Sequence, residues 1–281
     1  MVDRAPFDLA GRRPGGREER QTMKQEDLMA RLDSYTFYQQ VDLGGGLKTP
    51  GLPTGPKQRQ VLRFIDSLDL KAKRVLDVGC ANGLFSFAAE KRGAGEVVAV
   101  DHTKNNIDCI NDILALHLKS RVRAHHVNML DMTPEVHGRF DLIVFAGVLY
   151  HLRYPFRGLQ VIRDLMAPGG YLVLETGIFE DFGHRAVLST PSPDDSPQKS
   201  RGGNACAFFN ERGLREALAY FGFRVEQAAV PGQGWKRLVK KALGSLPVAY
   251  LPISNAVFLC RYDPDREDRF LREFYEGNPE R

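Results

Sequence analysis

The chain has 281 residues, enough for one large α/β domain with additions but short for a second full domain. Its hydrophobic content of 43% and charged content of 26% are ordinary for a globular protein and exclude general disorder. The net charge of +4 is too small to indicate nucleic-acid binding without a clustered basic patch.

The sequence also limits the possible cellular location of the protein. It has no apolar run of roughly 18 residues and no apolar segment near its start, so we expect neither secretion nor membrane spanning. The cysteines show no paired spacing; they are Cys80, Cys109, Cys206 and Cys260. This usage predicts reduced thiols in a cytoplasmic protein without a metal site.

The N-terminal part divides into a tail and an arm. Residues 1–25 are rich in Arg, Gly and Pro and are expected to be disordered. Residues 26–56 form the arm, in which an apolar pattern over 26–38 predicts a lid helix packed on the core. Residues 41–56 contain so many Gly and Pro residues that we expect no regular structure there. A loop of this length either binds a ligand or links the arm to the core.

Helices and strands then alternate from residue 57 to residue 262. The expected strands are 73–78, 96–101, 121–127, 140–146, 170–176, 223–230 and 255–262. The expected helices are 57–68, 84–92, 104–118, 133–137, 156–167 and one that Asn210 caps, ending near Phe221. This alternation predicts an α/β fold with a Rossmann-like, doubly wound sheet and a ligand site at the C-terminal ends of the strands.

Two insertions and a tail complete the second half. Residues 177–204 are polar and predict a flap near the site. Residues 231–254 include an amphipathic helix with a basic face. That helix either covers the edge of the sheet or contacts an anionic acceptor or a membrane surface. Residues 263–281 form a C-terminal tail.

The segment RVLDVGCANGLFSFAAEKRGAGEVVAVD, residues 74–101, carries the strongest functional signal. Asp77 ends a buried strand, and Gly79 and Gly83 bracket the turn into a helix. Without a Cβ at either glycine, a ligand could lie against the backbone at the helix N-terminus. The next strand ends at Asp101, whose carboxylate is placed to accept both hydroxyls of a ribose. The spacing predicts a nucleoside site, and its D-x-G-x-x-x-G pattern differs from the dinucleotide fingerprint.

This turn resembles motif I of the class I S-adenosylmethionine-dependent methyltransferases. FDLIVFAGVLYHL, residues 140–152, resembles that family's fourth-strand motif, and LMAPGGYLVLET, residues 165–176, resembles its turn into the fifth strand. The resemblance covers roughly residues 57–262. It implies seven strands with the last one antiparallel, and S-adenosyl-L-methionine as the methyl donor.

The resemblance also assigns residues to the donor. Asp77, Gly79 and Gly83 would hold the methionine end, and Asp101 the ribose. The adenine would lie at Asn128, and the sulfonium above Gly147. The full set expected at the donor is Asp77, Gly79, Cys80, Gly83, Asp101, His102, Asn128, Met129, Leu130, Ala146 and Gly147.

Tyr150 and His151 are the catalytic candidates. A hydroxyl acceptor needs a base during attack, and histidine titrates near neutral pH, so His151 is the candidate base. The alternative is a structural histidine bonded to a backbone carbonyl. Tyr150 either hydrogen-bonds the acceptor or packs in the core. Glu175 and His184 are weaker candidates at the same edge.

Within the family, GVLYH and LVLET are most similar to the tRNA wobble-uridine carboxymethyltransferases, which use a carboxylated donor. A second carboxylate on the donor requires cationic partners. The positions that match the subgroup's lysine and arginine hold Gln39 and Asn255. We therefore expect ordinary S-adenosylmethionine and transfer of a methyl group.

The sequence supports three functional hypotheses. The first is O-methylation of a small or oligomeric hydroxylated acceptor, such as a sugar, a glycolipid or a natural product. The second is tRNA modification at the wobble uridine, which predicts a broad positive surface and salt-sensitive binding. The third is a non-catalytic nucleoside-binding module, since a fold does not determine a function. A homo-oligomer is compatible with each of them.

Overall fold

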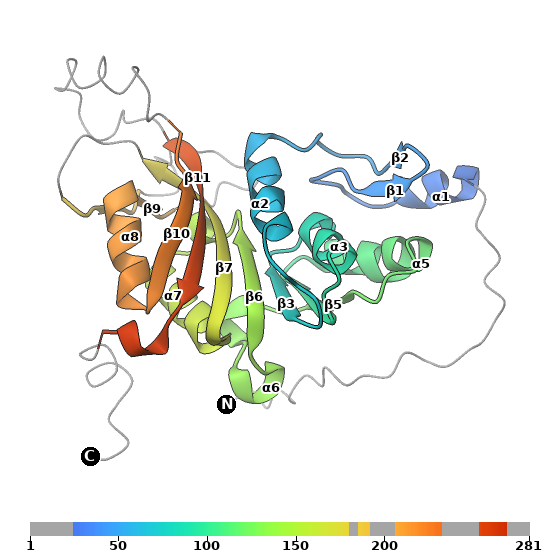
Figure 1. Cartoon of the computed structure of the whole chain (residues 1–281). Coiled ribbons are helices and arrows are strands. Elements are labelled where there is room, and N and C mark those ends of the chain that lie inside the picture. Colours follow the sequence, from blue (N-terminus) through green and yellow to red (C-terminus); the bar gives the residue numbers. More distant parts are fainter. Residues whose placement is uncertain (1–24, 180–184, 192–205, 232–252, 269–281) are drawn as a thin grey trace, which may run out of the picture.

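Figure 1 presents the computed structural model, which describes residues 25–179, 185–191, 206–231 and 253–268. The predicted tails, 1–25 and 263–281, lie mostly outside these residues. The same holds for the predicted flap, 177–204, and for the basic amphipathic helix within 231–254. His184 also lies outside them.

One mixed sheet runs through the molecule in the order β10-β11-β7-β6-β3-β4-β5. Its strands are β3 (Arg74–Val78), β4 (Glu96–Asp101), β5 (Arg123–His126), β6 (Phe140–Ala146), β7 (Met166–Phe179), β10 (Phe223–Ala229) and β11 (Ile253–Tyr262). Strand β11 is antiparallel to both β7 and β10, whereas β3 to β7 pair in parallel. The predicted Rossmann-like sheet of seven strands with an antiparallel last strand is confirmed. Two short strands not predicted, β8 (Leu188–Ser189) and β9 (Phe208–Phe209), extend it beside β7.

Helices cover both faces of this sheet, which explains its continuous apolar strands. On one face lie α2 (Pro56–Asp66), α3 (Leu84–Lys91) and the helical stretch after β4, whose side chains join Val75 and Val144 in one core cluster. On the other face, α7 (Pro155–Asp164) and α8 (Glu211–Tyr220) pack against Leu76 and Ile143. Figure 1 shows α8 and α2 on opposite sides of the strands.

Some predicted elements differ in detail from the structure. The helix expected at 156–167 ends at Asp164, and the strand expected at 170–176 begins at Met166 and runs to Phe179. The helix expected at 104–118 consists of α4 (Lys104–Cys109), a π-helical turn (Ile110–Leu114) and α5 (Ala115–His117). The short helix expected at 133–137 is α6 (Pro134–His137). The Asn210 cap of α8 is confirmed, because its Oδ1 accepts a hydrogen bond from the backbone N–H of Gly213 at 2.7 Å.

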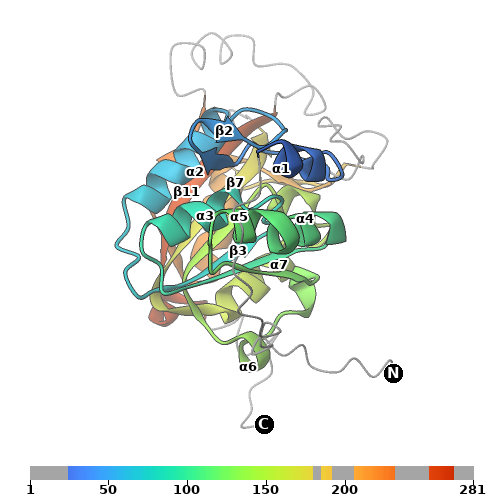
Figure 2. The same cartoon turned by 90° about the vertical axis from the view of Figure 1, so that its right-hand side faces the viewer.

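The N-terminal arm departs most from prediction. Helix α1 (Gln25–Leu32) ends six residues earlier than the predicted 26–38 segment. The 41–56 stretch, expected to lack regular structure, contains a hairpin of β1 (Asp42–Gly44) and β2 (Leu47–Lys48). The expectation was wrong because Gly44, Gly45 and Gly46 all have positive φ and together build the hairpin turn. Figure 2 shows this arm above α3 and α5, as does Figure 1.

Candidate functional site

The C-terminal ends of β3, β4 and β6 meet where the strand order switches. Strand β3 lies between β4 and β6, so the chains leaving these strands diverge at this edge. Ligands of doubly wound sheets bind in such a crevice. The structure places Asp77, Asp101 and Gly147 at this edge, and Asn128 two residues after β5.

The turn after β3 requires glycine at two positions. Gly79 has φ of +70°, and a Cβ there would lie 2.3 Å from Cγ2 of Val148. Gly83 has φ of +84° and is the N-cap of α3. The N–H groups of Gly79 and Cys80 both donate to the carbonyl of Val100, at 2.8 and 3.1 Å. These bonds fix the turn against β4 and direct the N-terminus of α3 to the edge of the sheet.

The Asp101 carboxylate shapes the same edge. It is 6% exposed, and its oxygens accept hydrogen bonds from the backbone N–H of Ala81 (2.9 Å) and of Thr103 (2.8 Å). A carboxylate offers about four lone-pair sites, so about two remain for a ligand. The side chain therefore fits a ribose diol. His102 is 82% exposed and lies 3.5 Å from Asp101 Oδ1.

Asp77 is buried inside the fold. It is 1% exposed, and its Oδ2 accepts a hydrogen bond of 2.6 Å from the Ser86 hydroxyl in the first turn of α3. Burial raises the pKa of Asp77 to about 7, and the charge of Asp101 adds to this effect. Asp77 thus joins β3 to α3, and its predicted contact with the methionine end stays a prediction.

The segment after β5 begins with a side-chain cap. Asn128 Oδ1 accepts a hydrogen bond from Leu130 N at 3.0 Å, which closes the short helix Met129–Asp131. His126 Nε2 lies 2.8 Å from the carbonyl oxygen of His102, so β5 is tied to the loop after β4. Asn128, Met129 and Leu130 are thereby fixed at the expected edge.

Asn82 connects the N-terminal arm to this turn, a role that the sequence did not predict. Its side chain is fully buried, accepts a hydrogen bond from Tyr38 N (2.9 Å) and donates one to the Thr36 carbonyl (3.2 Å). Asn105 accepts a further bond from Thr36 N at 3.1 Å. Residues 36–38 therefore cross the loops that follow β3 and β4. The only local signal for Asn82 is its place between Gly79 and Gly83.

Polar groups gather where β6 and β7 end. In the strand register Ala146 is paired with Glu175, and Gly147 N donates to the Glu175 carbonyl at 2.9 Å. A Cβ on Gly147 would lie 3.5 Å from Glu175 Oε2 and 4.0 Å from the Tyr150 hydroxyl. Lys57 Nζ of α2 lies 3.5 Å from Glu175 Oε1. We call Lys57, Gly147, Tyr150 and Glu175 the edge cluster.

Burial dominates the electrostatics of the edge cluster. Tyr150 is 5% exposed, and burial together with the nearby charge of Glu175 raises the pKa of its phenol. Glu175 is 3% exposed, and burial raises the pKa of its carboxyl, while the Lys57 ammonium opposes this effect. From the sequence, Glu175 was only a weak candidate and Lys57 was not a candidate. The two residues are far apart in the chain, so no local pattern predicts that they form an ion pair.

His151 follows Tyr150 in the short helix Leu149–His151. The rings of the two residues have centroids 4.2 Å apart, and His151 is half-buried. The Cys206 thiol donates to the His151 carbonyl, and the N–H groups of Cys206 and Ala207 donate to the Tyr150 carbonyl. The residues just before β9 thus hold Tyr150 and His151 in place.

The two positions compared with the subgroup's cations hold neutral amides, of which Gln39 is buried and Asn255 is half-buried. Gln39 is 8% exposed, and Asn255 lies on β11. In the part of the chain that the structure describes, Gln39 Oε1 and Asn255 Oδ1 have no hydrogen-bond partner. The same residues contain no cluster of three or more His, Cys, Asp or Glu side chains that could hold a metal ion. They also contain no helix with the length and apolar character needed to cross a membrane.

A family model described as a methyltransferase domain matches residues 55–228, more than half of the chain. The chain belongs to this family. With the fold, this membership confirms the sequence-based prediction of a class I S-adenosylmethionine-dependent methyltransferase. The segment matched runs from the loop before α2 into β10, so it includes the glycine turn after β3 and the edge cluster.

Curated relatives of this methyltransferase include a tRNA U34 carboxymethyltransferase from Pseudomonas fluorescens (strain Pf0-1). The two are 36% identical over 45% of this chain and 39% of that protein, so the chain spans about two fifths of its relative's length. This match confirms the similarity to the tRNA wobble-uridine carboxymethyltransferases that GVLYH and LVLET indicated, over the part of the chain that it covers.

Solved structures share the fold at low sequence identity. The N-terminal domain of EvdMO1, crystallised in the presence of SAH and D-fucose, has a TM-score of 0.61 at 15% identity, covering 86% of this chain and 98% of that one. An O-methyltransferase from a trans-AT PKS multienzyme of Brevibacillus brevis, in complex with S-adenosyl-L-homocysteine, has a TM-score of 0.53 at 17% identity. It covers 75% of this chain and 73% of that one. These likenesses support the Rossmann-like methyltransferase fold.

Proposed function

We propose that this methyltransferase transfers a methyl group from S-adenosylmethionine to a hydroxyl of a small or oligomeric acceptor, such as a sugar, a glycolipid or a natural product. The observation that carries the proposal is the edge cluster. It gathers a carboxylate, a phenol and the adjacent His151 beside Gly147, next to the turn that fits the donor. These groups suit an uncharged acceptor that forms hydrogen bonds and must lose a proton.

The residues at the strand ends fit the donor. Gly79 and Gly83 leave the backbone open beside the N-terminus of α3, and Asp101 keeps lone pairs for a ribose diol. Asn128 and its neighbours would line the adenine. When bound, S-adenosylmethionine supplies an electrophilic methyl group on a sulfonium. The chain's own contribution is to position the acceptor in line with that group and to exclude water.

His151 is the proposed base. Burial and the Glu175 charge raise the pKa of Tyr150, so its hydroxyl keeps its proton near neutral pH and serves as a hydrogen-bonding group. Histidine exchanges a proton in the neutral range, which suits removal of the acceptor's hydroxyl proton as the new C–O bond forms. His151 lies against Tyr150 and can take this role from the same edge.

The charges at the edge favour the ordinary donor over a carboxylated one. Lys57 is already paired with Glu175, and neutral amides stand at Gln39 and Asn255. A second donor carboxylate would meet Glu175 at this edge without a free cation among these residues to balance it.

Wobble-uridine modification of tRNA is the second candidate, favoured by the match to tRNA U34 carboxymethyltransferases. It predicts binding that weakens steeply with salt, because phosphate contacts release counterions. A small acceptor predicts little dependence on salt. Cytoplasmic location and homo-oligomer formation remain predictions.

The test is transfer of a labelled methyl group to two sets of acceptors, unmodified tRNA and a panel of sugars, glycolipids and hydroxylated natural products. Label in the second set, released by ether cleavage, would support O-methylation. Label in tRNA alone, with transfer that falls steeply as salt rises, would overturn it in favour of the second candidate. Failure to bind S-adenosylhomocysteine in a calorimetric titration would overturn both.

A further inference from the structure

We propose that Glu175 and Asn255, with the Tyr150 hydroxyl beside them, form an acceptor subsite that binds a neutral diol. This inference rests on the proposed function and names the substrate class of the same site. Two neighbouring hydroxyls of the acceptor would be involved, one held at the subsite and the other presented for methylation.

The strand register brings the two side chains together. In the β7–β11 pair, Val257 is opposite Glu175 and Asn255 is opposite Gly177. Residues two apart on a strand face the same side of the sheet, so Glu175 and Asn255 share one face as diagonal neighbours. Diagonal pairs of this kind lie roughly 7–8 Å apart. Gly177, opposite Asn255, contributes no side chain to this face.

Both groups are buried hydrogen-bond acceptors. Among the residues that the structure describes, Asn255 Oδ1 is buried without a hydrogen-bond partner, and the buried Glu175 Oε1 is in contact with the Lys57 ammonium at 3.5 Å. Native proteins rarely leave buried acceptors in this state unless a ligand or water completes them. The Lys57 ammonium, 3.5 Å from Oε1, favours the ionised form of Glu175, which can only accept hydrogen bonds. A ligand that satisfies both acceptors must therefore carry hydrogen-bond donors.

The subsite adjoins the position expected for the reacting methyl group. Glu175 Oε2 and the Tyr150 hydroxyl lie 3.5 and 4.0 Å from the point where a Cβ of Gly147 would stand. The resemblance to other methyltransferases puts the donor sulfonium over this glycine. Figure 1 shows the ends of β6, β7 and β11 side by side, with α2 beside them. A hydroxyl bound at Glu175 would thus be next to the hydroxyl that is methylated.

The charge of the cluster selects against anions. A carboxylate or phosphate on the acceptor brings further oxygens toward Glu175, whose charge would repel them. The Lys57 ammonium already balances the charge of Glu175, so the pair has no excess positive charge to hold a further anion. Neutral polyols satisfy the site, whereas acidic sugars do not.

The experiment measures binding of simple glycosides to the enzyme saturated with S-adenosylhomocysteine, by saturation-transfer NMR titration. The probes are methyl α-D-mannopyranoside, its 2,3-dideoxy analogue, which has no neighbouring hydroxyls, and methyl α-D-glucuronide. We expect the diol to bind at least tenfold more tightly than the deoxy probe and the glucuronide. Glu175→Gln and Asn255→Leu should each weaken the affinity for the diol about tenfold. Glu175→Gln should also reduce the difference in affinity between the diol and the glucuronide.

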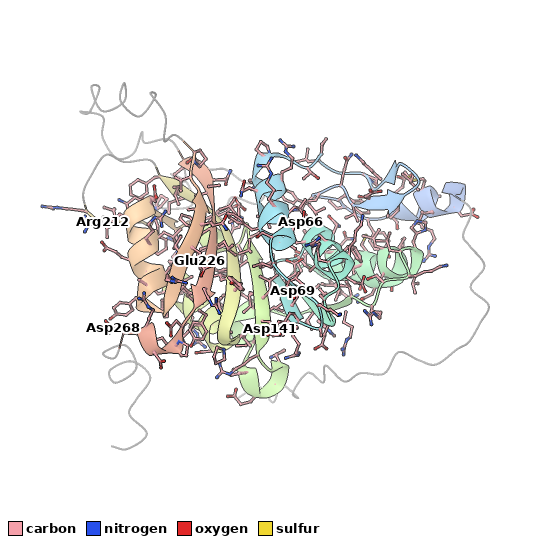
Figure 3. All side chains as sticks on the ribbon, viewed as in Figure 1. Asp66, Asp69, Asp141, Arg212, Glu226 and Asp268 are labelled. Atoms are coloured by element: carbon pink, nitrogen blue, oxygen red, sulfur yellow. The ribbon has the colours of Figure 1, made fainter. Side chains whose placement is uncertain are left out.

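The control is Glu226→Gln, which changes an exposed glutamate on β10 that is paired with Arg224 and is not part of the edge cluster (Glu226 is labelled in Figure 3). It should leave all three affinities unchanged. The subsite is refuted if the diol and deoxy probes bind equally, if none binds while S-adenosylhomocysteine does, or if both variants retain wild-type selectivity. Should Glu175→Gln fail to fold, Asn255→Leu carries the test. Loss of S-adenosylhomocysteine binding by the wild type would instead refute the proposed function.

Discussion

Replacing Gly79 with alanine tests the donor turn most directly. The φ of Gly79 is +70°, and the new Cβ would stand 2.3 Å from Cγ2 of Val148. The left-handed backbone costs an L-residue about 1–2 kcal/mol. Forcing a methyl group into a packed site costs about 1–3 kcal/mol more. The Gly79→Ala variant should therefore lose roughly 2–5 kcal/mol of unfolding free energy and bind S-adenosylhomocysteine more weakly.

A matched glycine separates these two effects. Gly93 has φ of +90°, but a Cβ there has nothing within 4 Å. Gly93→Ala should cost only the backbone component, about 1–2 kcal/mol. Shortening the neighbour with Val148→Ala should recover the steric component in the Gly79→Ala background, which a double-mutant cycle isolates.

Urea unfolding of the four variants and the wild type gives the free energies, and calorimetry gives the affinity for S-adenosylhomocysteine. If Gly79→Ala is no less stable than Gly93→Ala, the steric argument fails. It fails equally if Val148→Ala restores nothing, because the clash would then not be with that side chain.

Three further predictions concern individual side chains. His151→Ala should lower turnover roughly 100-fold or more while leaving S-adenosylhomocysteine affinity unchanged; unchanged turnover at saturating acceptor would remove the base assignment. Asp101→Ala should weaken that affinity about tenfold or more, since charged hydrogen bonds contribute about 1.5–3 kcal/mol, and wild-type affinity in a titration would count against the ribose role. Burial raises the Asp77 pKa from 3.8 to about 7. The contribution of this carboxyl to the free energy of unfolding is therefore fully present below pH 3.8, where Asp77 is protonated in both states, and is lost as the pH rises to about 7. Asp77→Asn should remove up to about 4 kcal/mol of this pH dependence, and coincident wild-type and variant profiles of unfolding free energy against pH would contradict it.

Local pattern predicted the sheet but not the details of the arm. Strand β6 is apolar apart from Asp141 and matches its predicted bounds, because a strand buried on both faces needs apolar residues along most of its length. The glycines at 44–46 were interpreted as breaking regular structure, and the structure uses them in a hairpin. Glycine permits both outcomes, and the strands on either side decide between them.

The sequence alone determined the parallel sheet, the glycine turn after β3 and the family, because each depends on contiguous residues whose spacing has a direct geometric meaning. The pairing of Lys57 with Glu175, the bridge from Asn82 to Thr36 and Tyr38, and the burial of Tyr150 were decided only by the tertiary structure. Those contacts join segments that are distant in the chain, and the burial that raises the pKa of Glu175 and Tyr150 exists only once the helices cover the sheet.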